Sequence, residues 1–290
     1  MNPLTGFLFF LGVAASSAAG MTIHRDLPYA EPKNERQSLD VYSPEKGGPA
    51  PVIVWIHGGG WQRGDKSTLA IGKPEQHLLK PQVFTDHGCV FVAINYRFVP
   101  NVDLKTMAGD VAKAIAWVKK NIRQYGGDPG SIFVMGHSAG AQLAAWVCID
   151  ERFLNAEGVA LRDLKGCVPV DGDSYYPALQ IDTSDLKLAS SYRMKFPEGS
   201  ERDLSSVLHI AKDKGIPPFL ILCVADYPQS GAAMQSQILS YYLNVASVPA
   251  KVVPVPGKTH PTLNSDLGLP NDEATRAILE FVDRVGKTPP

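Results

Sequence analysis

Residues 131–145, which read SIFVMGHSAGAQLAA, constrain the fold of this chain more than any other stretch. An apolar run of β-branched and aromatic residues meets GHSAG at residues 136–140, and small helix-forming residues follow. The pattern predicts a strand that passes into a helix through a very tight turn. Glycine at Gly136 and Gly140 leaves room for backbone that a larger side chain would strike. The turn therefore lifts Ser138 out of the fold, and we place the chemistry there.

Length and composition indicate one large α/β domain. The chain has 290 residues, of which 44% are hydrophobic and 20% charged, enough to bury a sizeable core. The formal net charge is −1 at pH 7, so no strong field attracts nucleic acid or an anionic membrane. We therefore expect no nucleic-acid partner, and a small-molecule substrate bound in a local pocket.

Residues 1–20 have the pattern of an export signal. An apolar run at residues 7–11 is followed by small residues that suit signal peptidase. No lysine or arginine precedes the run, and the alternative is a poorly ordered start or a short membrane anchor, although the run is short for a bilayer. We interpret residues 1–20 as a signal peptide and 21–290 as a single domain without stable membrane insertion, which predicts a secreted or periplasmic protein.

The four cysteines each lie in an apolar run, which favours buried small hydrophobic residues over a disulfide framework. Export would permit a disulfide, and four cysteines allow three pairings. None lies in a C-x-x-C motif or beside a cluster of metal ligands, so we expect no zinc. The residues are Cys89, Cys148, Cys167 and Cys223.

Strand-like and helix-like segments alternate along the chain. Strands are predicted at 22–29, 37–42, 52–56, 89–95, 132–134, 167–170, 219–224 and 250–255, and helices at 104–125, 231–244 and 271–285. This alternation predicts an α/β fold with a doubly wound, mostly parallel sheet and helices on both faces, begun by a hairpin edge. Residues 171–206 are irregular, and we interpret them as an excursion over the site.

A serine hydroxyl needs a base within hydrogen-bond reach, and the base needs an acid. His260 follows the last predicted strand, and Asp226 follows the strand at 219–224. The carboxyl ends of strands are where α/β sheets place catalytic groups. Asp171 and Asp173, one strand earlier, are competing acids. We predict the catalytic residues Ser138, Asp226 and His260.

A glycine cluster, HGGGW at residues 57–61, directly follows a buried strand. Amides without side chains can donate to the oxyanion of acyl transfer. We assign Gly58 and Gly59 to an oxyanion hole with the amide of Ala139; a structural turn is the alternative. His57 is interpreted as a residue that braces this turn.

Three aromatic residues are candidates for an acyl or alcohol pocket, with a place in the core as the alternative reading of each. They are Trp61, Tyr175 and Tyr176.

The chain resembles the α/β-hydrolase carboxylesterases of the hormone-sensitive-lipase-like type. The resemblance lies in HGGGW, the NYR that follows the next strand, GHSAG, Asp226 and His260. The resemblance covers residues 39–285. Within this range, GHSAGAQLAA and HGGGW are especially similar to the motifs of small feruloyl and acetyl esterases and of kynurenine formamidases. It implies a Ser138, Asp226, His260 triad without metal or cofactor. His137 stands where many relatives have an acidic residue, and Cys223-Val224 where a His-Gly pair is frequent.

We expect a serine carboxylesterase that hydrolyses short-chain or aryl esters through an acyl-enzyme. Residues 22–48 are too short and strand-like for the large helical cap of many relatives, which argues against long-chain lipids. Plant polysaccharide-linked acetyl or feruloyl esters are the favoured substrates. The alternatives are an amidase or arylformamidase, and a non-catalytic binding protein on the same scaffold.

Overall fold

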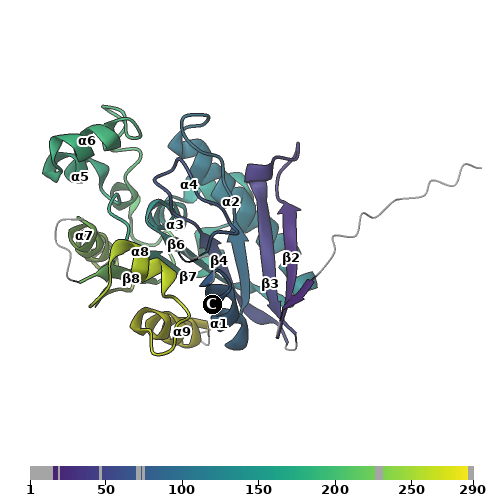
Figure 1. Cartoon of the computed structure of the whole chain (residues 1–290). Helices are drawn as coiled ribbons and strands as arrows, with labels where there is room; N and C mark the ends of the chain where they lie inside the picture. Colours follow the sequence, from purple (N-terminus) through teal and green to yellow (C-terminus); the bar gives the residue numbers. More distant parts are fainter. Residues whose placement is uncertain are drawn as a thin grey trace, which may run out of the picture.

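A computed structural model describes residues 16–18, 20–45, 48–69, 73, 76–225 and 231–286. Within these residues, nine strands form one sheet in the order β1-β2-β3-β5-β4-β6-β7-β8-β9 (Figure 1). The strands are β1 (Ser16–Ala18), β2 (Met21–Pro28), β3 (Ser38–Pro44), β4 (Ala50–Ile56), β5 (Val90–Ile94), β6 (Gly127–His137), β7 (Leu164–Val170), β8 (Phe219–Val224) and β9 (Ala250–Val255). From β5 to β9 in this order, neighbouring strands are parallel.

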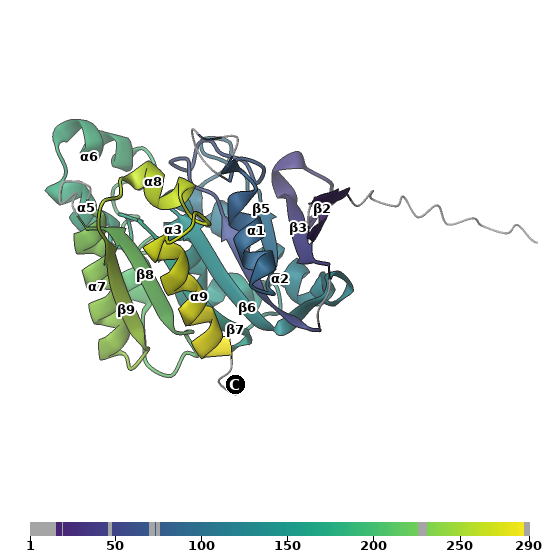
Figure 2. The same cartoon turned by 60° about the horizontal axis from the view of Figure 1, so that its bottom comes forward.

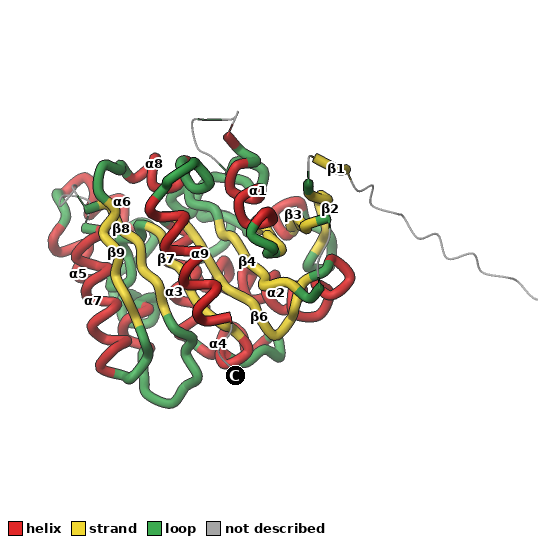
Figure 3. Tube along the Cα trace, turned by 90° about the horizontal axis from the view of Figure 1, so that it is seen from below, coloured by secondary structure: helices red, strands yellow, loops and turns green. Residues whose placement is uncertain are grey.

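Helices cover both faces of the sheet because its central strands are apolar on both sides. In β4, Val52 and Val54 point into one core with α2, α3 and α7, whereas Ile53 and Trp55 point into the other with α1, α8 and α9. Figures 2 and 3 show α9 running along the second face. The helices are α1 (Leu79–Asp86), α2 (Leu104–Asn121), α3 (Ala139–Ile149), α4 (Glu151–Ala156), α5 (Pro177–Thr183), α6 (Leu186–Arg193), α7 (Ala232–Val245), α8 (His260–Ser265) and α9 (Glu273–Gly286).

The predicted doubly wound α/β fold is confirmed. The predicted hairpin is the antiparallel pair β2 and β3, which joins the sheet through antiparallel contact of β3 with β5. The excursion at 171–206 contains α5 and α6, which lie at the opposite end of the sheet from β2 and β3 (Figure 1). All four cysteines are buried and unpaired.

The N-terminal segment falls largely outside the described residues. Of residues 1–19, only Ser16–Ala18 are described, and they pair with β2 as β1. The signal peptide and the secreted or periplasmic location therefore stay predictions. None of the described helices is both long and apolar enough to cross a membrane.

The turn between β6 and α3 depends on two glycines because backbone of neighbouring elements fills the space around them. A Cβ on Gly136 would lie 2.3 Å from the carbonyl oxygen of Gly140, and one on Gly140 would lie 2.2 Å from that of Ile56. The first contact is between β6 and α3 and the second between α3 and β4, so in both cases backbone would have to shift. The crowding predicted for the sequence G-x-S-x-G is therefore present at both positions.

We expect Gly136→Ala to lower the free energy of unfolding by about 2 kcal/mol or more, since the added methyl group overpacks rigid backbone. The matched control is Gly109→Ala, in the middle of α2, where a Cβ would meet nothing within 4 Å. That change should raise the free energy of unfolding by about 0.5 to 1 kcal/mol, because alanine favours the helix. Urea unfolding measures the free energy of unfolding of both variants. Equal changes in the two variants would contradict the conclusion that backbone crowding makes glycine necessary at Gly136.

Candidate active site

Ser138 and His260 meet at the carboxyl edge of the sheet. Ser138 sits between β6 and α3 with φ 56° and ψ −122°, a conformation that side chains rarely adopt and that projects the hydroxyl outward. His260 begins α8, after β9, and its Nε2 lies 3.0 Å from Ser138 Oγ. This distance lets the imidazole take the hydroxyl proton.

The carboxylate behind His260 is Asp171. Its Oδ2 accepts a hydrogen bond from His260 Nδ1 at 2.6 Å, and its Oδ1 accepts one from the Val224 amide at 2.9 Å. The side chain is fully excluded from solvent. Ser138, His260 and Asp171 therefore form one hydrogen-bonded series.

Among the described residues, the geometry favours the competing acid, Asp171, over the predicted one. We favoured Asp226, which lies outside the described residues, over Asp171, but Asp171 occupies the position beside Nδ1. The physical reason is topological: Asp171 directly follows β7, the strand next to the serine strand β6, and its amide is bound to the Leu222 carbonyl of β8. Asp226 follows β8, one strand further away.

Two carboxylates set the protonation of His260. Burial alone lowers the pKa of His260, but the hydrogen bond and charge of Asp171, together with the charge of Asp173, outweigh burial and raise it above the ordinary value. Loss of hydration raises the pKa of Asp173, whose carboxylate accepts hydrogen bonds from Ser174 and Tyr192. Asp173, the other competing acid, thus acts on His260 through charge and not through contact.

The HGGGW turn faces the serine. A Cβ on Gly58 would lie 3.1 Å from the Ser138 Cβ, so this backbone passes directly over the hydroxyl-bearing residue. Among the described residues, no acceptor is bound to the amides of Gly58, Gly59 and Ala139. Ala139 is the first residue of α3, where helix amides are free and the helix dipole favours negative charge. The three amides are thus available to an oxygen bound beside Ser138.

His57 braces this turn. Its Nδ1 donates to the Gly58 carbonyl at 2.7 Å, and its ring stacks on Tyr96 at 4.4 Å. Burial lowers the pKa of His57 to about 4, so the ring is neutral at pH 7. The neutral ring of His57 is held by these contacts, which agrees with its predicted role of bracing the HGGGW turn. Its Nδ1 is engaged with the Gly58 carbonyl and does not face Ser138 as a second base.

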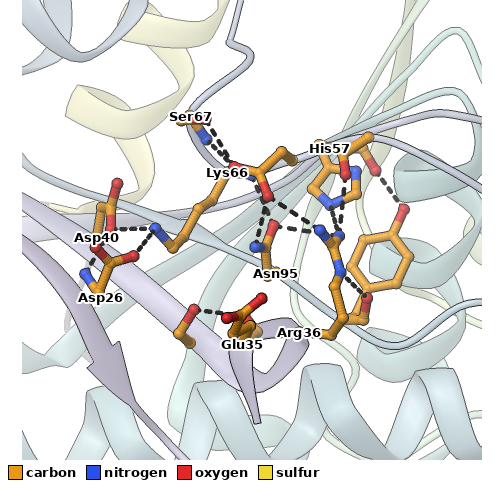
Figure 4. A network of polar contacts seen from close by, with 12 residues as sticks. Asp26, Glu35, Arg36, Asp40, His57, Lys66, Ser67 and Asn95 are labelled. Atoms are coloured by element: carbon orange, nitrogen blue, oxygen red, sulfur yellow. Dashed lines mark hydrogen bonds and ion pairs between the residues drawn. The ribbon is translucent and has the colours of Figure 1, made fainter.

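A polar network behind the turn, shown in Figure 4, was not found from the sequence. Arg36 Nη2 donates to the Gly64 carbonyl at 3.0 Å, Nη1 pairs with Asp65 at 3.0 Å, and the guanidinium lies 4.0 Å from the Phe98 ring centre. Asn95 donates to Asp65 at 2.8 Å. Arg36 follows β2 in sequence by several residues and carries no motif, so only the fold identifies it as a support for this turn.

Lys66 anchors the same network to the antiparallel strands. Its ammonium pairs with Asp26 at 2.6 Å and with the fully buried Asp40 at 2.7 Å, while its amide donates to Asn95 at 2.7 Å (Figure 4). The hairpin of β2 and β3 thereby holds the loop that follows β4.

His137, the residue before the serine, is buried behind the site. Its Nε2 donates to the His260 carbonyl at 2.9 Å, and burial with the charges of His260 and Lys80 holds its pKa well below the usual range. The ring is therefore neutral and fixes the backbone of His260. Lys80 secures α8 from the other side through a hydrogen bond to Asn264 at 2.6 Å.

A cavity of about 910 Å³ opens over Ser138 and His260. Its walls include the turn at Gly58 and Gly59, and also Ser191 and Lys195 from the excursion. The excursion thus reaches the site, as predicted.

The three aromatic residues proposed for the pocket lie in the core. Trp61 is 5% exposed and packs edge-on against Phe196, Tyr175 is fully buried, and Tyr176 packs against the core of α2, α3 and α7. None of them lines the cavity. Their alternative assignment to the core is the one that the structure supports, because a cavity wall cannot be recognised from aromatic character alone.

Comparisons with known proteins agree with this architecture. The family model described as BD-FAE matches residues 39–161. The probable carboxylic ester hydrolase LipM of Mycobacterium tuberculosis is 34% identical over 184 residues, which is 60% of this chain and 41% of LipM. The kynurenine formamidase of Danio rerio is 36% identical over 123 residues, or 42% of this chain and 37% of that protein.

Among solved structures, esterase B of Lactobacillus rhamnosus has a TM-score of 0.74 and 22% identity, over 92% of this chain and 87% of that one. The chain therefore has the α/β-hydrolase fold, and the predicted resemblance to esterases of this fold is confirmed. The chain spans less than two thirds of the length of the curated relatives that it matches first.

Asp65 links the network to pH. Burial alone raises the pKa of Asp65, but hydrogen bonds from Ser67 and Asn95 and the charge of Arg36 outweigh it and lower the pKa to about 2. A carboxylate whose pKa is depressed by folding stabilises the protein above its unfolded pKa of ~4, and that contribution is lost as pH falls towards 2.

We therefore expect Asp65→Asn to flatten the fall in free energy of unfolding between about pH 4 and pH 2. Urea titrations at several pH values measure the slope. The control is Asp213→Asn, an exposed residue with φ 64°, a conformation that asparagine tolerates. A wild-type slope in Asp65→Asn would contradict the role given to this network.

Proposed function

We propose that this α/β-hydrolase is a serine carboxylesterase in which Ser138, His260 and Asp171 form the catalytic triad. One observation carries the proposal: Ser138 Oγ lies 3.0 Å from His260 Nε2, and Nδ1 of the same ring lies 2.6 Å from a carboxylate excluded from solvent. This is the arrangement that makes a serine hydroxyl a nucleophile at neutral pH. Similarity to LipM supports the reaction class.

In the proposed reaction, His260 accepts the Ser138 proton as Oγ attacks the ester carbonyl. Asp171 keeps the proton of the ring on Nδ1 and stabilises the imidazolium that forms. The amides of Gly58, Gly59 and Ala139 donate to the oxygen that gains negative charge. His260 then protonates the leaving alcohol, and water releases the acid from the acyl-enzyme by the same steps in reverse.

Short-chain or aryl esters are the proposed substrate class. Residues 20–45 form β2, one turn of 3-10 helix and β3, so this segment builds no helical cap over the cavity. The cavity of about 910 Å³ is instead bounded by the HGGGW turn and the excursion. Polysaccharide-linked acetyl or feruloyl esters, and export of the chain, are parts of the proposal that rest on sequence alone.

Replacing the nucleophile tests the reaction class. We expect Ser138→Ala to lower kcat/KM on p-nitrophenyl acetate by more than about 10⁴-fold, because the variant lacks the hydroxyl that lies 3.0 Å from His260 Nε2. Wild type should react with a fluorophosphonate at Ser138, and the variant should not. Unchanged ester turnover in Ser138→Ala would refute the proposal.

A second prediction separates the two acids. Asp171→Asn should lower kcat/KM by roughly 10³ to 10⁴-fold, since an amide cannot hold the required tautomer of His260. Asp226→Asn should leave most of the activity. Equal losses, or a larger loss in Asp226→Asn, would return the role to Asp226.

The pH profile of the same variants is a further readout. The base works unprotonated, and its pKa is raised, so kcat/KM of wild type should fall with decreasing pH through a midpoint above 6.5. Asp171→Asn removes the larger of the two carboxylate effects that raise the pKa of His260, so the midpoint of this variant should move to lower pH.

Similarity to the Danio rerio kynurenine formamidase favours a second candidate, cleavage of an activated amide by the same residues. Comparing kcat/KM for phenyl acetate and N-formylkynurenine decides between them. Serine attack and the oxyanion are common to both substrates, whereas the acyl group and the leaving group, a phenol or an arylamine, differ.

A further inference from the structure

The cavity over Ser138 carries two cations that the proposed reaction does not use. Arg63 lies on the loop after HGGGW, and Lys195 lies just after α6 on the excursion. Two chain segments far apart in sequence thus bring positive charge to the same cavity.

Neither cation is neutralised by the part of the chain that the structure describes. No carboxylate of the described residues forms an ion pair with Arg63 or Lys195. Among the described residues of the cavity wall, the one acidic side chain is Asp65, which is already paired with Arg36 at 3.0 Å. The remaining titratable groups are histidines, of which His57 and His137 are held neutral by burial.

Lys195 is a positioned group and not a mobile surface lysine. The residue is 9% exposed, and its ammonium donates to the Ser191 carbonyl at 2.8 Å and to Ser191 Oγ at 2.9 Å. Both acceptors are uncharged, so neither acts as a counter-ion, and the ammonium has a third proton to donate. Burial lowers the pKa of Lys195. Burying a lysine in this way costs free energy unless an anion compensates it.

Arg63 provides the second, more exposed cation. Its amide donates to the Gly59 carbonyl at 3.2 Å, which closes the turn that faces Ser138. This hydrogen bond holds the backbone of Arg63 close to the amides of Gly58 and Gly59, which are proposed to bind the oxyanion. A planar guanidinium can bind a carboxylate through two parallel hydrogen bonds.

We propose that Lys195 and Arg63 bind an anionic substituent of the substrate, so that the enzyme prefers esters that carry a carboxylate near the scissile bond. This inference rests on the proposed esterase function. Gln62 and Lys195 also line a neighbouring cavity of about 640 Å³ with a largely apolar wall. Lys195 therefore lies between the two cavities. An anionic group of the substrate would bind at its ammonium, and the neighbouring cavity has room for the rest of the substrate.

The test compares each anionic ester with its neutral methyl ester. For the alcohol side, 4-acetoxybenzoate is paired with methyl 4-acetoxybenzoate; for the acyl side, p-nitrophenyl hydrogen adipate is paired with p-nitrophenyl methyl adipate. The ratio of kcat/KM, anionic over neutral, is the readout, with Ser138→Ala as the blank. The side whose ratio responds to the variants identifies which half of the ester carries the charge.

We expect Lys195→Gln to lower this ratio about tenfold, the effect of one charge-assisted hydrogen bond, mainly through KM. Arg63→Gln should lower it less, because Arg63 is exposed. Lys195→Arg should restore much of the preference, and the wild-type ratio should fall with added salt. Lys187→Gln, which removes an exposed charge from α6 outside the cavity, is the matched control and should leave the ratio unchanged.

A binding measurement separates failure of this inference from failure of the esterase proposal. Equilibrium dialysis of Ser138→Ala with 4-acetoxybenzoate and with hydrogen adipate esters should give a Kd that rises about tenfold when Lys195→Gln is added. Equal Kd values, or equal losses on anionic and neutral esters, would overturn the inference even where the enzyme hydrolyses neutral esters. Absent turnover with charge-dependent binding would overturn the esterase proposal alone.

Discussion

The close approach of two backbones, at the end of β4 and the start of α3, is the constraint on which the rest of this structure depends. A Cβ on Gly140 would lie 2.2 Å from the Ile56 carbonyl oxygen and 2.6 Å from that of His57. Because no side chain separates the two elements, the HGGGW turn and Ser138 become neighbours. The strained serine and the free amides opposite it are then consequences of one contact, which explains why both glycine motifs occur in one chain.

Two carboxylates, Asp171 and Asp65, lie on opposite sides of this contact, and each is held by hydrogen bonds and a nearby positive or ionisable group. On one side, Asp171 at the end of β7 faces His260, and its second oxygen is held by the Val224 amide. On the other side, Asp65 and Arg36 hold the loop after HGGGW. Both carboxylates have their positions fixed by at least two donors, so neither must reorganise when charge develops near Ser138.

Local patterns predicted much of the fold and part of the site. Apolar runs gave the strands from 52–56 onward, and the glycines around Ser138 gave the turn, because each signal is contained within a few residues. The choice between Asp171 and Asp226 was not local: it depends on which strand lies beside β6, and topology alone supplies that order. Arg36 and the core positions of Trp61 and Tyr175 likewise follow from tertiary packing, which leaves no motif in the sequence.

The same distinction applies to specificity. The groups proposed to react lie at the ends of β6 and β7 and at the start of α8, whereas Lys195 lies just after α6, far along the segment between β7 and β8. An insertion at this point can change the charge of the cavity without disturbing Ser138, His260 or Asp171, since none of its helices contributes to that series. The ammonium of Lys195 is buried, and its two acceptors are uncharged oxygens of Ser191. Burying a charge in this way lowers the free energy of unfolding. Binding of an anionic substrate group in the cavity that Lys195 shares with Ser138 would offset this cost, as proposed above.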